Sequence, residues 1–115
     1  MKIYSIVDAP SFNRAFADFQ NHLSVHGIGE NILFDCKLVF SELASNAVKH
    51  AGGGSIKVCV LEENIEITLV GEFVAPERSV CSPVTEEGGR GLYLIDSVCL
   101  RRENVAEGLK VVIKK

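Results

Sequence analysis

Three consecutive glycines, Gly52-Gly53-Gly54, divide this 115-residue chain into a helical part and a part that alternates like a sheet. Before them, apolar residues recur at three- and four-residue steps from Ile32 to Val48, which predicts an amphipathic helix beginning near Glu30 or Asn31. After them the period becomes two, at Ile56–Val60 and again at Ile65–Leu69, which predicts a β-hairpin with one buried face. Glycine disfavours the helix and permits positive φ, so the triplet marks the change.

Cap residues, prolines and glycines also mark where the other predicted elements begin and end. A strand is expected at Lys2–Val7, followed by a helix that opens at Asp8-Ala9-Pro10-Ser11 and ends at Gly27 and Gly29. After a long connection from Gly71 to Gly89, a helix is expected at Gly91–Cys99 and strands at about Val98–Arg102 and Leu109–Ile113. Directly joined hairpins with separate helices predict one domain, residues 1–115. Its fold class is α+β: a two-layer sandwich whose mainly antiparallel, mixed sheet carries the helices on one face.

Composition narrows the classes of function. The formal charge of −3 argues against a nucleic-acid platform, and no apolar run approaches the ~18 residues of a membrane span. A secretory leader is not visible and the four cysteines have no zinc-type spacing, so we expect a cytoplasmic protein with reduced thiols. A basic set near the C-terminus is expected to form a solvated sheet face: Arg101, Arg102, Lys110, Lys114 and Lys115.

Glu42, Asn46 and His50 are spaced at i, i+4 and i+8 and therefore line one face of the second helix. A carboxylate, an amide and an imidazole in a row could form a site, or they could form a solvated helix face. Asparagine has poor propensity for a helix interior, so Asn46 favours the first interpretation.

The segment Ser41-Glu42-Leu43-Ala44-Ser45-Asn46-Ala47-Val48-Lys49-His50-Ala51 resembles the N-box of the GHKL (histidine kinase-like) ATPase superfamily, and most closely its bacterial anti-sigma-factor serine kinases. The resemblance implies the histidine kinase-like ATPase fold and two cofactors, ATP and Mg²⁺. It implies that Glu42 is the general base, that Asn46 supplies an oxygen to the metal, and that Asn46 and His50 belong to the nucleotide site.

A second segment, Gly88 to Ile95, resembles the glycine box of the same family, which closes over the triphosphate. Glycines that run into a helix start allow backbone N–H groups to approach an anion closely. The resemblance implies nucleotide-binding roles for Gly89, Arg90, Gly91 and Leu92. The preceding stretch, Pro76 to Glu87, corresponds to the ATP lid of that family.

One motif of the family is missing. Where its members carry D-x-G-x-G, whose aspartate binds the adenine amino group, this chain reads Leu69 to Pro76, with Gly71 at the aspartate position and Phe73 at the first glycine position. Glu72 could replace the aspartate only if a bulge shifted the strand by one residue. Losing a hydrogen bond to a charged group costs roughly 1.5–3 kcal/mol, about a tenfold to 150-fold loss of affinity.

Two functions follow from the resemblance. The first is an ATP-binding regulatory protein that transfers the γ-phosphoryl group of ATP to a serine of a partner, such as a sigma factor or an anti-anti-sigma-like protein. The second is a degenerate, non-catalytic partner-binding module of the same fold. A histidine-kinase ATPase domain fits less well, because the chain has no dimerisation helices or phosphoacceptor segment, and His22 and His26 are expected to have surface roles. A homodimer is implied by resemblance alone.

Overall fold

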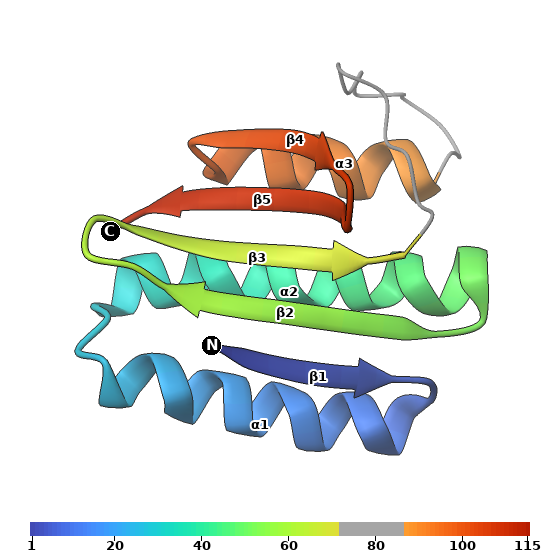
Figure 1. The fold of residues 1–115 in the computed structure, drawn as a ribbon, viewed down its shortest axis with the longest axis horizontal. Coiled ribbons are helices and arrows are strands. Elements are labelled where there is room, and N and C mark those ends of the chain that lie inside the picture. The colour runs from blue at the N-terminus through green and yellow to red at the C-terminus, as the bar shows by residue number, and fades with distance from the viewer. Residues whose placement is uncertain (72–86) are drawn as a thin grey trace.

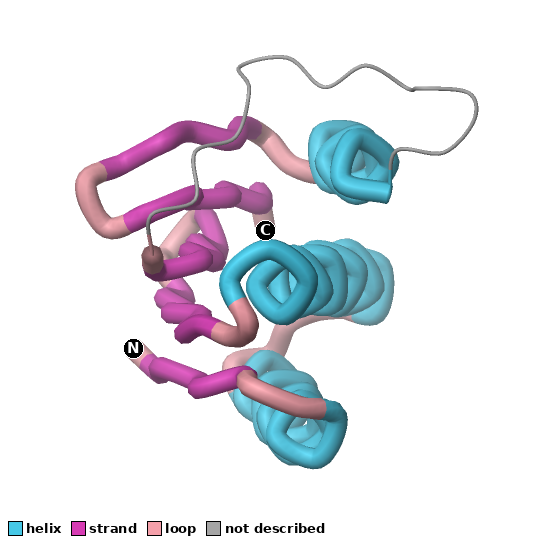
Figure 2. Tube along the Cα trace, turned by 90° about the vertical axis from the view of Figure 1, so that its right-hand side faces the viewer, coloured by secondary structure: helices cyan, strands magenta, loops and turns pink. Residues whose placement is uncertain are grey.

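The computed structural model describes residues 1–71 and 87–115, and the side chains of these residues except those of 50–51 and 87–92. In this part of the chain, three helices cover one face of a five-stranded sheet (Figure 1). Figure 2 shows the same two layers from the side, with α2 between α1 and α3. The predicted α+β sandwich with its helices on one face is therefore confirmed.

The order of elements matches the sequence prediction. The bounds are β1 (Lys2–Ile6), α1 (Ala9–Val25), α2 (Glu30–Ala51), β2 (Gly54–Val60), β3 (Asn64–Val70), α3 (Glu87–Val98), β4 (Arg101–Val105) and β5 (Gly108–Lys114). The strands lie in the order β1-β2-β3-β5-β4. Every pairing among the described strands is antiparallel, so the mixed character expected of the sheet is not found there.

Local chemistry explains where the first two helices begin and end. The Asp8 carboxylate accepts a hydrogen bond from the Ser11 N–H at 2.8 Å, and the Ser11 hydroxyl accepts one from the Asp8 N–H at 3.0 Å, which is a capping box. Helix α2 ends at Gly52, whose φ is +69°. At Gly53, with φ +136°, a Cβ would lie 2.9 Å from the carbonyl oxygen of Ile6, so this position requires glycine.

The core lies between the helices and the inner face of the sheet. The rings of Phe19 and Phe40 stack with centroids 4.3 Å apart, and Tyr4 meets the ring of Phe40 edge-on. The strands contribute fully buried aliphatic side chains to the same cluster: Ile6, Ile56, Val58, Ile65, Ile67, Leu109 and Val111. These residues alternate along their strands, as the period of two predicted.

The outer face of the sheet carries charged side chains. Lys110 lies 3.7 Å from Glu66, its neighbour on β3, and Lys57 of β2 pairs with Glu107. Arg102 was expected on this face and that prediction is wrong. Its Cα partner on β5 is the core residue Val111, so its side chain lies on the helix side of the sheet, paired with Asp96.

The C-terminal boundaries also differ from the prediction. Helix α3 begins at Glu87 rather than Gly91, and β4 begins at Arg101 rather than Val98. The N–H of Cys99 still donates to the carbonyl of Ile95 at 3.0 Å, so helical hydrogen bonding continues past Val98. The chain joins the sheet at Leu100, whose N–H donates to the carbonyl of Val112 at 2.7 Å.

Candidate functional site

Helix α2 presents different residues to each of its neighbours. Leu43 and Ala47 are buried against the sheet, while Ala44 and Val48 line a groove shared with the start of α1. Successive residues of a helix are turned by about 100°. Glu42 and Asn46 therefore lie on the other side of Leu43 and Ala47, which is the side of α2 that contacts α3.

Asn46 is the unusual member of this face. Its side chain is only 4% exposed, and its Nδ2 finds no hydrogen-bond partner among the residues that the structure describes. A buried polar group without a partner costs about 1–3 kcal/mol. The interpretation of this face as a solvated one is therefore wrong for Asn46, and packing alone gives no reason for an amide there. We call this atom the open Nδ2.

Glu42 lies one helical turn before Asn46 and is partly exposed. A partly exposed carboxylate next to a buried amide can accept a proton from a group that approaches from solvent. The amide of Asn46 has one donor and one acceptor end, and rotation about its terminal bond exchanges them. The amide can therefore offer either a donor to an anionic oxygen or an acceptor to a cation at the same place.

The other predicted site residues lie on both sides of this pair. His50 belongs to the last turn of α2, one turn beyond Asn46, and its side chain is outside the described part. Gly89, Arg90, Gly91 and Leu92 fall in the first two turns of α3, again without described side chains. Glu72 and the segment from Pro76 lie outside the described residues. The structure thus places Glu42 and Asn46 together and brings the backbone of α3 alongside their helix.

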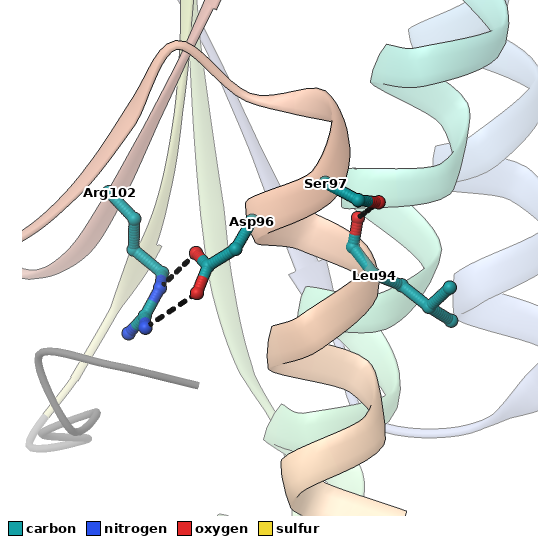
Figure 3. Close-up of polar contacts among 4 residues, drawn as sticks. All are labelled: Leu94, Asp96, Ser97 and Arg102. Atoms are coloured by element: carbon teal, nitrogen blue, oxygen red, sulfur yellow. Dashed lines mark hydrogen bonds and ion pairs between the residues drawn. The ribbon is translucent and has the colours of Figure 1, made fainter. Parts of the chain in front are cut away.

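One contact that no sequence pattern predicted fixes α3 against the sheet. Arg102 of β4 donates to both carboxylate oxygens of Asp96 on α3, from Nε at 2.7 Å and from Nη2 at 3.0 Å (Figure 3). The Arg102 side chain is only 5% exposed and that of Asp96 is 31% exposed, so this bidentate pair is partly buried. In the same turn the Ser97 hydroxyl donates to the carbonyl of Leu94 at 2.6 Å. Asp96 and Arg102 are six residues apart and lie on different elements. Neither the helical nor the strand period therefore indicates that they pair.

Gly71 is the residue that the resemblance aligns with the adenine-binding aspartate of the GHKL family. It directly follows β3, is exposed, and its N–H donates to the carbonyl of Glu107 at 2.9 Å. The turn between β4 and β5 is therefore tied to the end of β3. At Gly108, in the same turn, a Cβ would lie 1.9 Å from the carbonyl oxygen of Leu69, so the chains touch directly here.

The other reactive side chains are dispersed. Burial raises the pKa of Cys36 to about 12, so this thiol is unreactive near neutral pH. His22 and His26 meet edge-on at the end of α1, and burial, followed by the nearby His26, lowers the pKa of His22. Among the described residues, no three His, Cys, Asp or Glu side chains are grouped to hold a metal. None of the helices in this part of the chain has the length and apolar character needed to span a membrane.

Comparison with models of known protein families gives no match for this chain, and no curated protein matches it. What points to a function is therefore the set of residues on α2 and α3 and the resemblance of their two segments to the GHKL boxes.

Proposed function

We propose that this chain is a nucleotide-binding regulatory protein with the histidine kinase-like ATPase fold, resembling the anti-sigma-factor serine kinases. The site lies between the C-terminal half of α2 and α3 and takes Mg²⁺·ATP. The observation that carries the proposal is the open Nδ2 of Asn46, a buried amide on the predicted N-box face whose cost a ligand would offset.

The donor set suits a magnesium–phosphate group. Mg²⁺ is usually held by one or two protein oxygens together with phosphates and waters, so a three-residue cage is not required. Asn46 would provide its Oδ1 to the metal, and its open Nδ2 would donate to a phosphate oxygen. Gly88 and Gly89, in the first turn of α3, would provide backbone N–H groups for the phosphate oxygens.

Bound Mg²⁺·ATP would supply the transferable phosphoryl group and neutralise its charge. The protein contributes position and a base. Glu42, at the partly exposed rim, would accept the proton of a serine hydroxyl that a partner protein presents. The Asp96–Arg102 pair would hold α3 in place while the nucleotide is bound.

A second function is favoured by Gly71. Glycine offers no carboxylate to an adenine amino group, and its own N–H is taken by Glu107. A chain with this change could keep the fold and a docking surface for a protein partner without turning over ATP. This non-catalytic module is the alternative that the experiment must separate from the kinase.

The experiment measures the melting temperature with Mg²⁺·ATP, with ATP and a chelator, and with Mg²⁺ alone. If the protein is a kinase, we expect Mg²⁺·ATP at a 100-fold excess over its Kd to stabilise the fold by about 2.7 kcal/mol. Neither Mg²⁺ alone nor ATP with a chelator should do so. Asn46→Leu should abolish the shift. Glu42→Gln should keep the shift in melting temperature but lose the slow hydrolysis of ATP to ADP and phosphate.

Asn21→Leu is the matched control, since it makes the same chemical change at an exposed helical position. No shift at millimolar nucleotide would refute the kinase and leave the binding module. A full shift in the Asn46→Leu variant would show that nucleotide binds elsewhere.

A further inference from the structure

Two histidines lie one turn apart at the C-terminal end of α1, and the proposed nucleotide site does not use them. His22 and His26 are spaced at i, i+4, so their side chains share one face of the helix. The N–H of His26 still donates to the carbonyl of His22 at 3.3 Å, so the helical spacing is kept up to this residue. In Figure 1 this end of α1 lies at the opposite end of the molecule from the C-terminal half of α2. The histidine pair is therefore separate from the nucleotide site.

The two imidazole rings lie at the separation that one metal ion requires. Their centres are 4.7 Å apart, with an angle of 76° between the ring planes. An imidazole nitrogen ligates Zn²⁺ at about 2.0–2.1 Å, so two rings on one ion have their centres about 4.5–5.2 Å apart, from a right angle at the metal to a tetrahedral one. The end of α1 therefore already holds both rings within reach of a single ion.

Both rings are accessible, and the proton competes weakly at one of them. His26 is exposed and His22 is half-buried, so water can occupy the remaining positions of an ion. Burial, followed by the nearby His26, lowers the pKa of His22. An imidazole must be neutral to ligate a metal, so this shift favours binding near neutral pH.

The charges that face His22 are those of Asp18, Lys2 and the amino terminus. Asp18 lies one turn before His22, and its carboxylate accepts hydrogen bonds from the Lys2 amine at 2.8 Å and the Tyr4 hydroxyl at 2.7 Å. Because Lys2 is paired with this carboxylate, it repels an approaching cation less. The carbonyl groups at the end of α1 are the negative end of the helix dipole, which also favours a cation here.

We propose that His22 and His26 bind one transition-metal dication of the class that prefers imidazole (Zn²⁺, Ni²⁺ or Cu²⁺), with water in its other positions. Two protein ligands leave the site open, so the ion exchanges with solution. Because both ligands lie within one helical turn, the bound ion holds the end of α1 in its helical form. Mg²⁺ and Ca²⁺ prefer oxygen ligands and do not compete. This inference does not depend on nucleotide binding.

The test is isothermal titration calorimetry of the reduced 115-residue chain with Zn²⁺ alone and with Ni²⁺ alone, in excess Mg²⁺ and without nucleotide. We expect one ion per chain. His26→Gln should raise the Kd at least about tenfold, since loss of even an outer partner of a metal ligand costs about 10–100-fold in affinity. His50→Gln is the matched control, because it makes the same change at the third histidine of the chain and should leave the Kd unchanged.

A second variant separates chelation from the mere presence of two histidines. Ser24→His combined with His26→Gln keeps the number of histidines but spaces two of them at i, i+2, on different faces of the helix. This double variant should bind as weakly as His26→Gln. Circular dichroism checks that each variant folds.

Nuclear magnetic resonance of the imidazole C–H groups locates the ion. In the parent chain the signals of His22 and His26 should shift together as Zn²⁺ is added, while the signal of His50 stays in place. No binding of Zn²⁺ or Ni²⁺ at millimolar concentration would overturn the proposal. So would binding that leaves the signals of His22 and His26 unchanged, or a double variant that binds as tightly as the parent.

Discussion

Replacing Asn46 by leucine should stabilise the ligand-free protein. The two side chains have the same branched heavy-atom skeleton, so the change removes polarity, and the neighbouring side chains must make room for the larger methyl groups of leucine. The open Nδ2 costs about 1–3 kcal/mol in the folded state. Leucine also has a higher helix propensity than asparagine, by a few tenths of a kcal/mol. Together these effects predict a gain of about 1–3 kcal/mol.

The gain can be measured by urea denaturation and by thermal melting. For a chain of this size, 1 kcal/mol shifts the midpoint by about 4 °C, so a rise of about 4–12 °C is expected. Asn21→Leu, at an exposed position of α1, should stay within about 0.5 kcal/mol of the parent. The contrast between the two substitutions isolates the burial of the amide.

The same variant should lose its response to Mg²⁺·ATP, so stability and ligand binding should move in opposite directions. A destabilisation of more than about 1 kcal/mol would refute the reasoning, because it would mean that the amide already makes a favourable interaction in the folded protein. A stabilised Asn46→Leu variant that still responds to nucleotide would confirm the cost of the buried amide and contradict the role of Asn46 in nucleotide binding.

Three other predictions concern the frame around the site. The N–H of Ser11 donates to Asp8 and lowers the pKa of Asp8; this contribution is complete above the unfolded pKa of about 4 and is lost as the pH falls through the folded value. The difference in urea midpoint between the parent and Asp8→Asn should therefore shrink from pH 6 to pH 3, and an unchanged difference would contradict the assignment. Asp96→Ala should lower the free energy of unfolding by roughly 1.5–3 kcal/mol, because it removes both hydrogen bonds that Arg102 donates to the carboxylate, and Asp96→Leu with Arg102→Met should recover part of this loss in the same denaturation assay. Gly108→Ala should lower the melting temperature by more than about 10 °C, since its Cβ would meet a backbone carbonyl at 1.9 Å, and a loss under about 1 kcal/mol would show that the turn can shift.

Most of the fold could be predicted because its signals are local. The change of period at Gly52–Gly54 and the capping box at Asp8 each act within a few residues, and the structure has them where the sequence puts them. The boundary between α3 and β4 could not be placed, since the short apolar stretch at Val98–Leu100 satisfies a helix and a strand equally well. Packing determines this boundary: Ile95 is buried in the core, and the N–H of Leu100 already donates a hydrogen bond to β5.

The candidate site was predictable in position but not in environment. Spacing along α2 placed Glu42 and Asn46 on one face, and the structure agrees. Periodicity could not tell that Asn46 is buried, because it lies at the edge of the apolar stripe, and whether that edge is covered depends on elements far along the chain. The position of Arg102 was missed for the same reason: its partner is chosen by the packing of α3 and not by a sequence pattern.

The bond between Asp96 and Arg102 also determines which parts of the protein open together. Because the pair joins α3 to the edge strand β4 through a partly buried bidentate contact, the helix and the strand should unfold locally as one cooperative unit. Their backbone amides should then show a common rate of hydrogen exchange, distinct from that of β2 and β3 in the middle of the sheet. A ligand that binds at the first turns of α3 would then slow exchange in β4 as well.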